Sequence, residues 1–88
     1  MKVKENYLLR QVMGNWVVVP VGSAGVSFRG MLTLNGSGVF LWRALQKECT
    51  LEELVTALTD AYEVKEEEAR QDIAEFLDTI RKTGCLEG

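Results

Sequence analysis

The sequence predicts an α+β fold in which a three-stranded antiparallel sheet is followed by a three-helix bundle. Two features of the 88-residue chain lead to this prediction. Six of the eight glycines and the only proline lie in residues 1–38, among runs of β-branched and aromatic residues. Beyond Asn35, apolar residues recur every three or four positions, as in amphipathic helices. With 47% hydrophobic and 26% charged residues, the chain fits one globular domain over residues 1–88.

The first two strands are expected to form a hairpin. Residues 7–12 are predicted to form the first strand, and a tight turn follows at residues 13–15, where Gly14 and Asn15 are able to take positive φ. The β-branched run at residues 16–19 forms the second strand. We expect Pro20 to end this strand, because proline cannot donate a hydrogen bond to a neighbouring strand.

The third strand is predicted over residues 28–34, after a glycine-rich connection at 21–25. Side chains of a strand alternate between its two faces. This alternation places Phe28, Leu32 and Leu34 on one face, and Arg29, Met31 and Thr33 on the other. Three short strands joined in sequence leave the sheet with open edges.

Three helices are expected after the sheet. Asn35 suits the N-cap of the first helix, and Thr50 with Glu53 forms a capping box at the start of the second. The third helix opens with the acidic residues 66–68 and ends at Gly84. The apolar positions expected to face the core are Val39, Leu41, Trp42 and Leu45 in the first helix, Leu51, Leu54, Val55, Leu58 and Tyr62 in the second, and Ala69, Ile73, Phe76, Leu77 and Ile80 in the third.

The charge distribution argues against nucleic acid as a partner. Residues 1–47 carry six Lys or Arg against one Glu, whereas residues 48–88 carry four against twelve Asp or Glu. A sheet with three helices has the outline of a winged helix-turn-helix. However, residues 50–62, where a recognition helix would lie, contain three acidic residues and no Lys or Arg. DNA phosphates repel such a helix, so a winged-helix DNA-binding regulator is the disfavoured alternative.

No catalytic, metal or cofactor site is expected. The chain lacks histidine, so its serines and cysteines have no imidazole base to activate them. Cys49 and Cys85 lie 36 positions apart and form no C-x-x-C motif, and we interpret them as small apolar residues. No apolar run approaches the length of a signal peptide core or of a membrane span of about 20 residues. We therefore expect a cytoplasmic protein without membrane association.

An open sheet edge beside a helix favours peptide binding. An extended peptide can join such an edge as an additional strand. Each added backbone hydrogen bond contributes only about 0.5–1.5 kcal/mol, so selectivity must come from side-chain pockets along the edge. The same edge can also pair with a second copy of the chain. A homodimerising scaffold is therefore a further alternative.

Several motifs together resemble those of PqqD-like proteins, a family named after the pyrroloquinoline quinone biosynthesis protein D. Residues 34–45 follow the pattern L-N-x-[ST]-G-x-x-[IL]-W-x-x-L. The resemblance continues through residues 50–54 and 58–62 and covers roughly residues 7–87. Gly36 departs from the bulkier polar residue that is usual at its position.

This resemblance implies a RiPP recognition element, a non-catalytic domain that binds the leader segment of a ribosomally synthesised precursor peptide. Such domains deliver the precursor to a modifying enzyme, often a radical SAM enzyme, and need no cofactor of their own. In the family, the leader adds as a strand beside the third strand, in the groove next to the third helix. Carried over to this chain, the implied peptide-binding residues are Arg29, Met31, Leu32, Thr33 and Leu34 from the strand, and Ile73, Phe76, Leu77 and Ile80 from the helix, with Asp72 as a polar residue at the rim.

Overall fold

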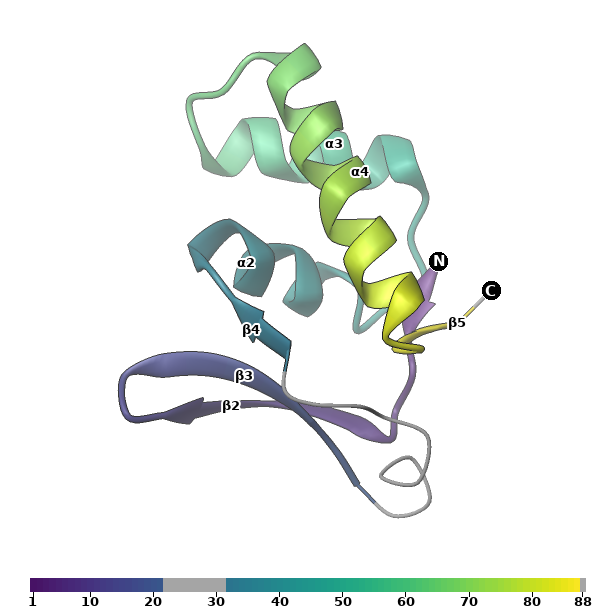
Figure 1. The fold of residues 1–88 in the computed structure, drawn as a ribbon. Helices are drawn as coiled ribbons and strands as arrows, with labels where there is room; N and C mark the ends of the chain where they lie inside the picture. The colour runs from purple at the N-terminus through teal and green to yellow at the C-terminus, as the bar shows by residue number, and fades with distance from the viewer. Residues whose placement is uncertain (22–31, 88) are drawn as a thin grey trace.

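The computed structural model describes residues 1–21 and 32–87 (Figure 1). The antiparallel sheet β2-β3-β4 precedes three helices, which confirms the predicted α+β fold. Figure 1 shows the helices on one side of this sheet, with α2 nearest to it. The elements are β1 (Lys2–Val3), β2 (Tyr7–Val12), β3 (Asn15–Pro20), β4 (Leu32–Leu34), α2 (Gly36–Ala44), α3 (Leu51–Ala61), α4 (Glu66–Lys82) and β5 (Leu86–Glu87).

The β2–β3 hairpin has a two-residue loop. Val12 pairs with Asn15, so only Met13 and Gly14 lie between the strands. These two residues have φ values of 51° and 83°, as the central residues of a type I′ turn require. The turn lies within the predicted residues 13–15, but Asn15 already belongs to β3, and Met13 rather than Asn15 takes the left-handed conformation beside Gly14.

β3 ends at Pro20, as the sequence predicts, and Pro20 itself still stands opposite Tyr7 of β2. Pairs in an antiparallel hairpin alternate between hydrogen-bonded and non-hydrogen-bonded, starting with a hydrogen-bonded pair at a two-residue loop. By this alternation the Tyr7–Pro20 pair is non-hydrogen-bonded, so β2 requires no N–H from Pro20. The next residue, Val21, donates its N–H to the Asn6 carbonyl oxygen at 2.9 Å. The register thus accommodates proline without losing a bond to β2.

The third predicted strand is described over its last three residues, and residues 28–31 lie outside the described part of the chain. Within β4, Leu34 is buried, Leu32 packs against the core and Thr33 is exposed. These residues follow the predicted alternation.

A second, two-stranded sheet was not expected from the sequence. β1 pairs antiparallel with β5, and Val3 stands opposite Leu86. Val3 also donates its N–H to the Leu45 carbonyl oxygen at 2.9 Å, which ties this small sheet to the end of α2. Strands of two residues carry too little periodicity to be recognised in a sequence.

The predicted helix caps are present. The Asn35 side chain accepts a hydrogen bond from the Gly38 N–H at 2.8 Å. Thr50 and Glu53 form both bonds of the capping box, at 2.9 and 3.1 Å. Gly84 follows the end of α4 with a φ of 84°, a conformation that L side chains disfavour.

The core lies between the helices and the sheet. Its largest fully buried side chains are Trp42, Leu41, Leu45, Leu54, Leu58, Ile73, Ile80, Val18 and Cys85. Two predicted core residues lie at the surface instead, because Leu51 is 42% exposed and Tyr62 is 41% exposed. Leu51 is the first residue of α3, and Tyr62 caps its C-terminus with extended backbone. Helical periodicity does not hold the Tyr62 ring on the inner face, and the ring packs edge-on against Phe40.

Candidate functional site

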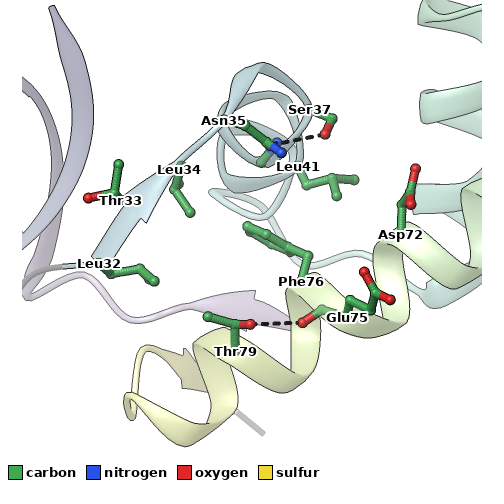
Figure 2. A pocket seen from close by; sticks show the side chains of 11 residues that line it. Leu32, Thr33, Leu34, Asn35, Ser37, Leu41, Asp72, Glu75, Phe76 and Thr79 are labelled. Atoms are coloured by element: carbon green, nitrogen blue, oxygen red, sulfur yellow. Dashed lines mark hydrogen bonds between the residues drawn. The ribbon is translucent and has the colours of Figure 1, made fainter.

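A groove of about 270 Å³ lies between β4 and α4, next to the start of α2 (Figure 2). The groove therefore brings the consecutive segments β4 and α2 together with α4, which lies about 30 residues further along the chain. The lining residues are Leu32, Thr33 and Leu34 from β4, Asn35, Ser37, Gly38 and Leu41 from the α2 region, and Asp72, Glu75, Phe76 and Thr79 from α4.

β4 is the edge strand of its sheet. The strand order is β2-β3-β4, and within residues 1–21 and 32–87 no strand pairs with the outer edge of β4. This outer edge borders the groove, because all three residues of β4 line it. The groove thus combines a strand edge with side chains from a helix.

The register determines which backbone groups of β4 point outward. By the alternation that begins at the hairpin loop, Val17 directs its N–H and C=O toward β2, and its two neighbours direct theirs toward β4. Leu32 and Leu34 pair with those neighbours and are hydrogen-bonded to β3. Thr33 stands opposite Val17, so its N–H and C=O point away from β3. The open edge therefore offers one donor and one acceptor from the same residue.

Apolar side chains form the middle of the groove. Figure 2 shows the Phe76 ring projecting from α4 toward β4 and α2. Phe76 is half-buried, and Leu34 and Leu41 beside it are buried at 8% and 1% exposure. A partly exposed aromatic ring over buried leucines leaves apolar surface for a bound molecule to cover.

The turn from β4 into α2 is closely packed at Gly38. A Cβ atom at this position would lie 3.1 Å from the Asn35 Oδ1 atom and 3.3 Å from the Leu34 Cβ atom. Ser37 also donates its hydroxyl to Asn35 Oδ1, at 3.1 Å. Glycine at position 38 thus lets the capped turn approach the strand that borders the groove.

The charged side chains of α4 differ in their surroundings. Arg70 contacts Glu52 of α3 at 2.7 Å and Glu66 at 3.2 Å. The Arg70 guanidinium lowers the pKa of the Glu52 carboxyl below its usual value, mainly through hydrogen bonds. Asp72 and Glu75, by contrast, line the groove and form no ion pair within the described residues.

The peptide-binding residues that the family resemblance implies fall into three groups in the structure. Leu32, Thr33, Leu34, Asp72 and Phe76 all line the groove. A second set is buried in the core, with exposures of 0% for Ile73, 6% for Leu77 and 0% for Ile80. Arg29 and Met31 lie outside the described residues. A peptide-binding role for each of these residues stays a prediction.

Six lining residues were not among the predicted peptide-binding residues: Asn35, Ser37, Gly38, Leu41, Glu75 and Thr79. A signal for two of them was available. Glu75 and Thr79 follow Asp72 by three and seven positions, and residues with this spacing share one face of a helix. The other four belong to the capped turn and first helix after β4, and their place in the groove depends on how α2 packs against α4.

The described residues offer little for metal or thiol chemistry. Within residues 1–21 and 32–87, no three Cys, Asp or Glu side chains are grouped to hold a metal ion. Both cysteines are free thiols, and burial raises the pKa of each above its usual value. In the same part of the chain, no helix has the length and apolar character that crossing a membrane requires.

Comparison with known proteins identifies the family. The sequence profile described as "Coenzyme PQQ synthesis protein D (PqqD)" matches residues 15–86. The chain belongs to the PqqD family. This match confirms the family resemblance of the sequence motifs, and no curated protein matches the chain.

A solved structure shares the fold of this PqqD-family chain. Its description is "TbiB1 in Complex with the TbiA(beta) Leader Peptide". The TM-score is 0.78 at 23% sequence identity, and the similarity covers 100% of this chain and 96% of that chain. The whole described architecture therefore corresponds to a known fold.

Proposed function

We propose that this protein binds the leader segment of a ribosomally synthesised precursor peptide as an added strand along β4. The domain itself catalyses no reaction and presents the precursor to a modifying enzyme, with a radical SAM enzyme as the first candidate. Family membership and the leader peptide bound to TbiB1 support this proposal. The groove beside an open strand edge supports it independently.

The outward backbone pair of Thr33 is the observation that carries the proposal. A guest residue opposite Thr33 can exchange two hydrogen bonds with it, as in any antiparallel hydrogen-bonded pair. The side chains of the guest residues on either side then lie on the same sheet face as Leu32 and Leu34. That face borders the groove, so every second guest side chain points toward α4.

Side-chain burial must supply most of the affinity. Two backbone hydrogen bonds contribute about 0.5–1.5 kcal/mol each. Covering apolar surface contributes about 25 cal/mol per Å², and the half-buried Phe76 ring offers such surface in the groove. Binding then raises the local concentration of the precursor near an enzyme that holds this domain, without any chemistry by the domain itself.

Proline substitution at Thr33 tests the strand addition. Thr33→Pro removes the outward donor and places the ring at the edge where the guest would lie, while the bonds to β3 remain. The leader of a precursor encoded beside this protein's gene should bind about tenfold more weakly or worse, measured by fluorescence anisotropy. Thr33→Val keeps the N–H and the β-branched shape, and this variant should bind as the wild type does.

Leu32→Pro provides the opposite control. The Leu32 N–H belongs to the pair with Val18, so its removal should lower the melting temperature more than Thr33→Pro does. If folded Thr33→Pro protein binds the leader with unchanged affinity, the peptide does not add to this edge. Amide chemical shifts that move in α4 and at Thr33 on titration would locate the peptide in the groove.

The winged-helix alternative receives no support from the surface of α3. The acidic side chains of Glu52, Glu53 and Asp60 lie on this helix, which contains no Lys or Arg. DNA phosphates would be repelled by a recognition helix of this composition. Pairing of β4 with a second copy of the chain would compete with the leader, and sedimentation with and without peptide separates the two.

A further inference from the structure

Two carboxylates at the groove have no cationic partner in the part of the chain that the structure describes. Asp72 and Glu75 are exposed residues of α4, and neither forms an ion pair within the described residues. Among residues 1–21 and 32–87, no Lys or Arg lines the groove. Of the three cations in α4, Arg70 contacts Glu52 and Lys82 contacts Asp78 at 2.9 Å, whereas Arg81 is exposed in the last turn and does not line the groove. The groove therefore has a net negative wall.

The negative wall lies toward one end of the groove. Figure 2 shows Asp72 at the end where α2 begins and Thr79 at the opposite end, near Leu32. Phe76 lies between these two ends. An extended peptide that passes along β4 would therefore meet apolar side chains first and carboxylates next, or the reverse, depending on its direction.

The spacing of these features matches that of a strand. Phe76 and Asp72 are four positions apart, slightly more than one helical turn, or about 6 Å along the axis of α4. Groove-facing side chains of an extended guest repeat every second residue, or about 6.6 Å. Two successive groove-facing side chains of the guest can therefore contact Phe76 and Asp72, with Glu75 beside them.

We propose that the groove selects peptides that carry Lys or Arg two residues from an apolar residue. The apolar side chain covers Phe76, and the cation lies between the carboxylates of Asp72 and Glu75. An acidic residue at the same position would be repelled. The two carboxylates therefore favour basic residues and disfavour acidic residues at this position of the peptide. This inference rests on the proposed strand addition and specifies which peptides that addition favours.

A random peptide library tests the preference. Displayed peptides of about ten residues, enough for a strand across the groove, are selected on the wild-type protein and on two variants. The double variant Asp72→Asn with Glu75→Gln removes both negative charges from the groove wall. Glu67→Gln with Glu68→Gln removes the same charge from exposed positions of α4 that do not line the groove. Wild type and the Glu67/Glu68 variant should enrich Lys or Arg two positions from an apolar residue, and the Asp72/Glu75 variant should not.

Synthetic peptides then measure the effect. In the best selected sequence, replacing the basic residue with Gln should weaken binding to wild type by about fivefold at low salt. The same replacement should change binding to the Asp72/Glu75 variant little, and the difference should shrink in high salt because the charges are screened.

The outcomes separate this inference from the proposed function. Enrichment of alternating apolar residues without any basic preference would overturn the charge selection and leave strand addition intact. Basic enrichment that persists in the Asp72/Glu75 variant, or disappears equally in the Glu67/Glu68 variant, would also overturn it. If no extended peptide is enriched and the encoded leader fails to bind, both proposals are wrong.

Discussion

Two adjacent faces of α4 differ in what they contact. One face is closed against the core through Ala69, Ile73 and Ile80, each at 0% exposure, and Leu77 at 6%. The other borders the groove through Asp72, Glu75, Phe76 and Thr79. Successive residues of an α-helix point about 100° apart, so a single apolar stripe can reach both faces. Phe76 belongs to this apolar stripe, lies at its edge and is half-buried.

The side chains of α4 that stabilise the fold and those that can bind a ligand therefore lie on different faces of the same helix. The core face is fully enclosed, so its side chains contribute to the free energy of unfolding. The groove face retains open apolar and acidic surface, so its side chains are available to a ligand. Substitutions on the two faces should therefore change different measurements.

The largest effect is expected from the core face. Ile73→Ala removes buried methyl and methylene groups at a position with 0% exposure and should lower the free energy of unfolding by about 2–5 kcal/mol. Urea denaturation followed by circular dichroism measures this change. Ile73→Val, which removes one methylene, should cost only about 0.5–1.5 kcal/mol.

The binding measurement makes the test decisive. Where Ile73→Ala protein is still folded, the leader should bind it about as tightly as the wild type. A variant that loses little stability but no longer binds would place Ile73 at the peptide and contradict the division of α4 into two faces.

A smaller effect with the opposite signature is expected from Phe76→Ala. Because the ring is only half-buried, its removal should lower the free energy of unfolding by less than Ile73→Ala does. Leader binding should weaken by about tenfold, because the guest loses its main apolar contact in the groove. Phe76→Leu keeps most of the apolar surface and should bind at an intermediate level. Equal loss of stability in Phe76→Ala and Ile73→Ala would place Phe76 on the core face and contradict the division of α4 into two faces.

The sequence predicted the stripe but not its division. Ile73, Phe76, Leu77 and Ile80 recur at helical spacing, and this periodicity shows only that they share one side of a helix. Which of them is enclosed depends on where β4 and α2 lie, and that is a property of the packed molecule. Glu75 was missed although it lies three positions after Asp72 on the same helix face, and only the packing of β4 and α2 shows that this face borders the groove.

Features that depend on neighbouring residues were predicted more successfully than features that depend on strand pairing. The Asn35 cap depends on contacts within three residues, and the sequence alone predicts it. The pairing of Pro20, the last residue of β3, with Tyr7 depends on the register with β2. Likewise, the outward direction of Thr33 requires the hairpin loop length and the pairing of β3 with β4. Register links distant segments, and the sequence of a single chain does not encode it locally.

The smallest effect is expected at a third face of α4, where Arg70 joins Glu52 of α3 through two hydrogen bonds of 2.9 and 2.7 Å. Glu52→Gln should lower the melting temperature slightly at pH 7 and leave leader binding unchanged, because this pair lies outside the groove.

The stability contributed by this pair should depend on pH in one direction. Arg70 lowers the Glu52 pKa in the folded protein, so the pair stabilises the fold above the usual value of 4.5. The contribution disappears as the pH falls through the lowered pKa and the carboxyl is protonated. The melting temperatures of wild type and Glu52→Gln should therefore differ at pH 7 and converge at about pH 2. A difference that persists at the lower pH would assign the effect to packing rather than charge, and a loss of leader binding would show that the α3–α4 contact positions the groove wall.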